Sequence, residues 1–69
     1  MAVHYYFNYA QLDEDGMCVG VQTTTVDCSG NPNLVEIPVY DIAYICKYYI
    51  NGNWYEDAEG NIPWQSSLV

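Results

Sequence analysis

The strongest constraint on the fold is a two-residue alternation of side chains in two neighbouring segments. In residues 3–12, Val3 and Phe7 fall on one face and Asn8 falls on the other, a period that predicts a β-strand. Residues 17–26 alternate in the same way and contain three consecutive threonines, which favour extended structure. Gly16 lies between the two segments and can take the positive φ that closes a tight loop. The two segments are therefore predicted to form an antiparallel hairpin.

Turn residues predict shorter elements in the middle of the chain. Residues 27–33 (DCSGNPN) are typical of a loop, because they combine Gly, Pro, Asn and Ser. Residues 34–37 form a short predicted strand, which Pro38 ends because proline cannot donate to a ladder. Asp41 is placed to cap a single helical turn over residues 42–45.

Asn51-Gly52 is the clearest hairpin signal of the sequence. It separates two runs rich in apolar residues, 47–50 and 53–56, and a type I′ turn needs positive φ at both central positions. Residues 57–61 contain a further turn with a glycine. Residues 62–64 are then expected to return along the sheet.

These elements predict a mainly β fold, a small antiparallel meander of about five strands with one short helical turn. With 69 residues the chain makes one small domain over 1–69, and residues 65–69 are expected to fray. A domain of this size buries only roughly 60% of the surface that its unfolded chain exposes. Further stabilisation is therefore expected from association with a second copy, a homodimer.

The charge balance excludes several classes of function. Lys47 is the only lysine, arginine is absent, His4 is the only histidine, and nine acidic residues bring the net charge to −8. Neutralising phosphates takes many lysines and arginines, so the sequence predicts no direct binding of nucleic acid or of an anionic membrane. The expected partner is a protein with a basic or neutral surface.

The cysteines and the N-terminal residues favour an intracellular protein. Three cysteines (Cys18, Cys28 and Cys46) are an odd number without Cys-x-x-Cys spacing, which favours reduced thiols over disulfides. A zinc site of these cysteines with His4 would lack the paired ligands that such sites usually have. The first residues, MAVHYYFNYA, lack the charged and apolar regions of a signal peptide. Together these features predict a soluble, intracellular protein.

The order of the motifs resembles that of small bacteriophage and prophage reading frames found near tail genes. The resemblance covers roughly residues 9–56 and rests on four motifs: Asp13-Glu14-Asp15-Gly16-Met17-Cys18-Val19-Gly20-Val21, Pro32-Asn33-Leu34-Val35-Glu36, Tyr40-Asp41 and Lys47-Tyr48-Tyr49-Ile50-Asn51-Gly52-Asn53-Trp54. In that family such segments occur as whole proteins or as tips of longer ones. The resemblance therefore implies a phage protein that meets a host protein in the host cytoplasm or, as the alternative, is part of the virion. It supplies no catalytic residues to transfer.

Metal binding and catalysis are both disfavoured by the residue pattern. Asp27 begins an alternation of oxygen-bearing side chains, but an EF-hand loop starting there would have Pro32 and Pro38 where Gly and Glu are needed. Acid–base catalysis needs a carboxyl group buried enough to raise its pKa. The acidic residues lie instead in predicted turns, so no enzymatic activity, cofactor or metal is expected. They form two candidate partner-binding clusters: Asp13, Glu14 and Asp15, and Glu56, Asp57 and Glu59.

Aromatic side chains suggest two further surfaces. The C-terminal half is rich in tyrosine and tryptophan, which can build a core or stack on sugars, so carbohydrate binding is a third hypothesis. The first strand has no charge between Val3 and Leu12, which makes it a candidate exposed edge. We therefore predict a homodimer interface that includes Tyr5, Phe7 and Tyr9.

The favoured function is a non-enzymatic inhibitor of a host antiviral-defence protein, acting through an acidic, tyrosine-rich surface. The alternative is a virion or tail-associated structural module, which the resemblance supports. The inhibitor is preferred because a tail part usually carries a longer shaft or anchoring region.

Overall fold

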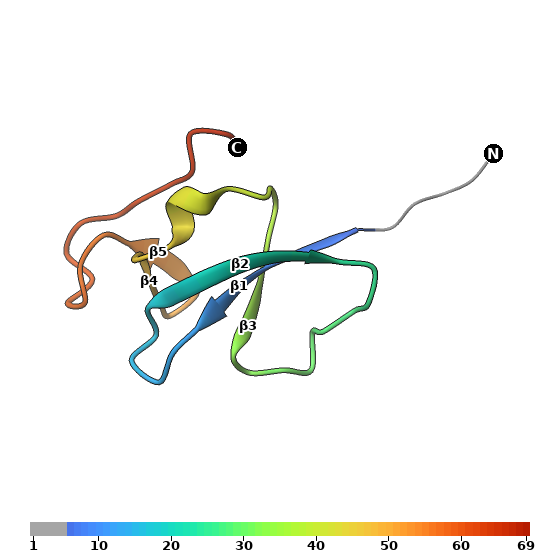
Figure 1. The fold of residues 1–69 in the computed structure, drawn as a ribbon. Coiled ribbons are helices and arrows are strands. Elements are labelled where there is room, and N and C mark those ends of the chain that lie inside the picture. Colours follow the sequence, from blue (N-terminus) through green and yellow to red (C-terminus); the bar gives the residue numbers. More distant parts are fainter. Residues whose placement is uncertain (1–5) are drawn as a thin grey trace.

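The structure is a computed structural model, and it describes residues 6–69 (Figure 1). In these residues five strands and one short 3₁₀ turn follow each other along the chain, which confirms the predicted mainly β fold and the single helical turn. Residues 1–5, which include Val3, His4 and Tyr5, lie outside the described part. The elements are β1 (Phe7–Leu12), β2 (Cys18–Thr24), β3 (Leu34–Ile37), η1 (Ile42–Tyr44), β4 (Tyr48–Ile50) and β5 (Asn53–Tyr55).

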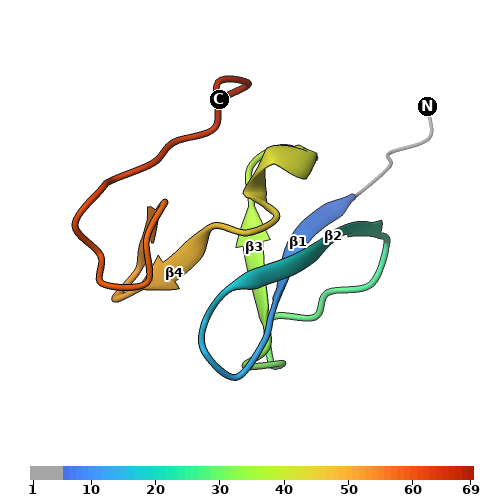
Figure 2. The ribbon, with the colours of Figure 1, turned by 60° about the vertical axis from the view of Figure 1, so that its left-hand side comes forward.

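The first three strands form an antiparallel sheet in the order β2-β1-β3, with β1 in the middle (Figure 2). In a simple meander the third strand would pair with the second. Here the loop over residues 25–33 carries the chain back across the sheet, so that Ala10 pairs with Val21 on one side and with Val35 on the other. The predicted antiparallel pairing of the strands is therefore confirmed. The crossover from β2 to β3 is a feature that the sequence did not predict.

The two-stranded sheet β4-β5 is joined to the first sheet by backbone hydrogen bonds. Met17 forms an isolated antiparallel bridge with Tyr48, and the N–H of Cys18 donates to the carbonyl of Lys47 over 2.8 Å. A second bridge pairs Tyr55 with Pro63, as expected for a segment that returns along the sheet. Backbone hydrogen bonds thus run without a break from β3 through β1, β2, β4 and β5 to residues 62–64.

Two glycine turns set the position of β4. Gly52 has a φ of 85° and Asn51 a φ of 51°, the type I′ geometry predicted from the sequence. Gly16 has a φ of 84°, and a Cβ there would lie only 3.3 Å from the carbonyl oxygen of Tyr49. Glycine at position 16 therefore allows the first hairpin turn to approach the backbone of β4 closely.

The core is built around the ring of Tyr44. This side chain is only 3% exposed and packs with Ala10, Cys18 and Ile37. Its ring meets those of Trp54 and Trp64 edge to face, at centroid distances of 5.0 and 4.9 Å. The short η1 turn thus joins the two sheets by placing one aromatic side chain between them.

The C-terminal residues are anchored at Ser66, which differs from the expected fraying of residues 65–69. Ser66 is 3% exposed and donates a hydrogen bond of 2.5 Å from Oγ to Oδ2 of Asp41. The other carboxylate oxygen of Asp41 accepts the N–H of Ala43, as predicted for a helix cap. The Ser66 hydroxyl also accepts the N–H of Leu68. One carboxylate therefore caps η1 and holds the tail.

The predicted dimer interface on the first strand is corrected by the strand order. β1 is paired on both sides, so it is not a free edge. Tyr9 is 1% exposed in a single chain, and its hydroxyl accepts the N–H of Cys28 and donates to Asp27, which fixes the crossover loop. Tyr9 is therefore a core residue. Phe7 is half-buried, and Tyr5 lies outside the described residues.

Candidate functional site

The first acidic cluster lies in the turn between β1 and β2. Asp13 shapes this turn, because its Oδ1 accepts the N–H groups of Asp15 and Met17 over 2.9 and 3.0 Å. The carboxylates of Glu14 and Asp15 are exposed. Of the three predicted contact residues, one therefore builds the turn and two are free to meet a partner.

The second cluster has the same division of roles. Asp57 closes the turn after β5, with Oδ1 accepting the N–H groups of Asn61 and Ile62 over 2.9 Å each. These N–H groups, that of Ile62 above all, lower the pKa of the Asp57 carboxyl below its ordinary value. Glu56 and Glu59 are exposed. Again an aspartate holds the backbone while two glutamates extend into solvent.

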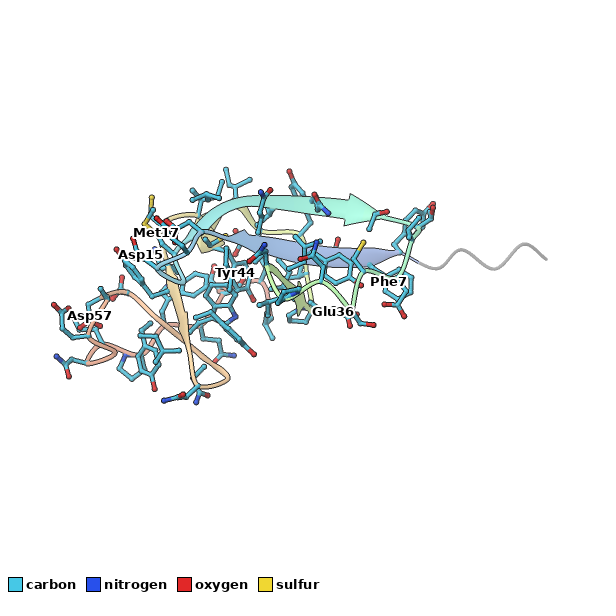
Figure 3. All side chains as sticks on the ribbon, turned by 90° about the horizontal axis from the view of Figure 1, so that it is seen from below. Phe7, Asp15, Met17, Glu36, Tyr44 and Asp57 are labelled. Atoms are coloured by element: carbon cyan, nitrogen blue, oxygen red, sulfur yellow. The ribbon has the colours of Figure 1, made fainter. Side chains whose placement is uncertain are left out.

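The fold brings the two turns to the same end of the molecule, far from Phe7 (Figure 3). We call the four exposed carboxylates of these turns the acidic end: Glu14, Asp15, Glu56 and Glu59. Sequence reasoning treated the clusters as separate, because nothing local shows that the bridge between Met17 and Tyr48 places one turn beside the other hairpin.

The only lysine does not neutralise this end. Lys47 Nζ lies 5.1 Å from the ring centroid of Trp64, in a cation–π arrangement. No ion pair is found in residues 6–69, so the carboxylates of the acidic end have no cationic neighbour there. The acidic end therefore keeps its unpaired negative charges, which produce a negative field around it.

Two half-buried tyrosines contact the turns that carry the acidic end. Tyr49 contacts the first turn through its carbonyl, 3.3 Å from the Cβ position of Gly16. The ring of Tyr55 lies 3.8 Å from the Cβ position of Gly60 in the second turn. Across the Asn51-Gly52 hairpin, Tyr49 faces Trp54 and Tyr48 faces Tyr55. Their phenols combine an apolar ring with a polar tip, as at many protein interfaces.

The tryptophans are engaged in packing. Trp54 meets the rings of Tyr44 and Tyr49, each at 5.0 Å, and Trp64 meets Tyr44 and the Lys47 ammonium. A sugar-binding platform needs an open ring face. These contacts favour a structural role for both tryptophans.

The three cysteines differ sharply in environment. Cys18 is fully buried, and burial raises the pKa of its thiol. Cys28 is half-buried and Cys46 exposed, and all three are free thiols. The structure thus leaves Cys46 as the most accessible sulfur, although a thiol alone defines no catalytic site.

The oxygen-rich loop after β2 uses its side chains to shape the backbone. Asp27 Oδ1 accepts the N–H of Ser29, and Asn31 Oδ1 accepts that of Asn33, each over 2.9 Å. Among residues 6–69 we find no group of side chains arranged to hold a metal ion and no pocket. A turn-forming role accounts for the pattern that resembles a calcium loop.

Comparisons with known proteins add no assignment. The chain matches no family model, no curated protein and no solved structure. In the described part of the chain, no helix has the length and hydrophobicity needed to span a membrane. The geometry of the surface is therefore the basis for a functional proposal.

Proposed function

We propose that this chain is a non-enzymatic, phage-encoded protein that binds and inhibits a host antiviral-defence protein through its acidic end. The observation that carries the proposal is the gathering of four exposed carboxylates at one end of the molecule, on turns that contact the half-buried residues Tyr49 and Tyr55. Such a surface fits a basic protein surface, because opposite charges steer association and tyrosine rings supply contact area. The phage origin rests on the resemblance of the four sequence motifs. The host cytoplasm is the proposed location.

The acidic end can be neutralised without disturbing the turns that present it. A variant with Glu14→Gln, Asp15→Asn, Glu56→Gln and Glu59→Gln keeps Asp13 and Asp57, which hold the backbone. The matched control is Glu36→Gln on β3, which is also exposed but lies away from Asp15 and Asp57 (Figure 3). Both variants should fold like the unmodified chain.

We expect the neutralised variant to bind a host protein captured from bacterial lysate at least roughly tenfold more weakly, because several charge contacts of about 0.5 kcal/mol each are lost. Binding by the unmodified chain should weaken as salt rises. Titration calorimetry at two salt concentrations measures both effects. Equal binding by the neutralised variant and the Glu36→Gln control would refute the role of the acidic end.

The virion alternative is tested in the same host. Mass spectrometry of purified virions should find the chain absent while the host complex is present in lysate. Detection at stoichiometric amounts in virions, without a host complex, would replace the inhibitor by a structural tail module.

A further inference from the structure

The outer edge of β2 is open over its second half. The start of this edge is covered, because Cys18 is bonded to Cys46 and Lys47. Beyond Cys18, no strand of residues 6–69 pairs with this side of β2. In Figure 3, β2 runs along one side of the molecule with β1 beneath it. An open strand edge is a template for pairing with another chain.

The pairing of β1 with β2 and β3 determines which N–H and C=O groups of β2 point away from the sheet. The N–H of Leu12 donates to the carbonyl of Asn33, so the even-numbered residues of β1 bond to β3 and the odd-numbered ones to β2. Tyr9 and Gln22 therefore form a hydrogen-bonded pair. It follows that the N–H and C=O groups of Val21 and Thr23 point outward.

The two edges of the sheet differ in protection. On β3 the outward positions include Glu36, and Pro38 follows the strand, two features that block edge pairing. On β2 no charged residue and no proline occurs between Met17 and Val26, and Val19 is 47% exposed. The edge of β2 thus carries neither a charge nor a proline beyond its start, where the pairing with β1 is irregular and η1 packs against the strand.

We propose that the edge of β2 pairs with the same edge of a second copy, antiparallel, about a two-fold axis at Gln22. In this register Val21 of each copy bonds to Thr23 of the other, which satisfies all four outward groups of each chain. Gln22 then faces Gln22 of the second copy in a close, non-hydrogen-bonded pair.

The charge of the β2 edge favours a second copy of this chain over a basic protein as the partner of this edge. The carboxylates that attract a basic protein lie at the acidic end, whereas the open edge is uncharged. An uncharged strand is complementary to its own copy, because no like charges meet within the ladder. Each chain still carries a net charge of −8, so self-association should strengthen as salt screens the repulsion between copies. Partner binding at the acidic end responds to salt in the opposite direction.

Charged residues at position 22 test whether the two-fold axis of the proposed dimer passes through Gln22. Gln22→Lys and Gln22→Glu should each weaken self-association roughly threefold to tenfold, because each places like charges opposite one another. An equimolar mixture of the two variants should associate more tightly than either alone. Sedimentation equilibrium from about 10 µM to about 1 mM covers the weak range expected for a small interface. The matched controls are Gln11→Lys and Gln11→Glu, at an exposed glutamine of the central strand, and they should change little.

A second measurement uses the unmodified chain. The amide protons of Val21 and Thr23 should exchange slowly at high protein concentration and rapidly at low concentration. A monomer up to about 1 mM would overturn the proposal. Opposite effects of Gln22→Lys and Gln22→Glu would also overturn it, because they would indicate a response to net charge alone. Self-association that is as tight in Gln22→Lys and Gln22→Glu as in the unmodified chain would overturn it too.

Discussion

Tyr44→Ala is expected to remove a large part of the free energy of unfolding, about 3–5 kcal/mol. The substitution removes a ring that is 3% exposed and contacts both Trp54 and Trp64, and truncating a buried aromatic side chain costs about 3–5 kcal/mol. A domain of this size has a total stability of only roughly 3–10 kcal/mol. Urea denaturation followed by tryptophan fluorescence measures the loss, since both tryptophans report on the contact.

Two matched variants separate the role of this ring from that of tyrosines in general. Tyr44→Phe keeps the ring contacts and should cost less than about 1 kcal/mol. Tyr40→Ala removes the same side chain from a position that is 50% exposed, and should also cost less than about 1 kcal/mol. If Tyr44→Ala were as mild as Tyr40→Ala, the ring would not be what holds the two sheets together.

Ser66→Ala is expected to destabilise the protein by about 2–3 kcal/mol, because it removes a buried hydrogen bond to an ionised group. The neighbouring Ser67 is exposed, and Ser67→Ala is the matched control, with an expected change below about 0.5 kcal/mol. Thermal unfolding at neutral pH compares the two. Equal melting temperatures would show that the bond from Ser66 to Asp41 contributes nothing to the stability of the fold.

The effect of Ser66→Ala should depend on pH in the acidic range. The Ser66 hydroxyl, the Ala43 N–H and the charge of Lys47 lower the pKa of the Asp41 carboxyl from its ordinary value of 3.8. A lowered pKa in the folded state means that the stabilisation is complete above this ordinary value and is lost as pH falls through the folded one. The difference in free energy of unfolding between Ser66→Ala and the unmodified chain should therefore become smaller below about pH 4. A constant difference from pH 7 to pH 3 would contradict this assignment.

Local sequence patterns predicted the parts of the fold that depend on neighbouring residues. The alternation in residues 17–26 and the Asn51-Gly52 turn gave strands and a hairpin whose register places Tyr49 opposite Trp54. Asp41 caps η1 as expected. In each case the determining contacts lie within a few residues of one another, where turn geometry and side-chain period act directly.

Long-range contacts were not visible in the same way. The alternation placed Tyr9 on a strand face but gave no sign that β3 would pair with β1, so a central strand was taken for an edge. Ser66 lies 25 residues from Asp41, and nothing in its neighbours indicates this bond. For the acidic end, the sequence indicated two separate clusters of carboxylates, whereas their position at one end of the molecule depends on the bridge from Met17 to Tyr48.

The bridge between Met17 and Tyr48 makes the separation of the two sheets measurable by proteolysis. Trypsin cuts after lysine and arginine, and the only such bond in the whole chain joins Lys47 to Tyr48. The carbonyl of Lys47 accepts the N–H of Cys18, and Tyr48 is the residue that pairs with Met17. A protease can reach this bond only when the two sheets separate, so the rate of the single cut measures how often the halves of the molecule come apart.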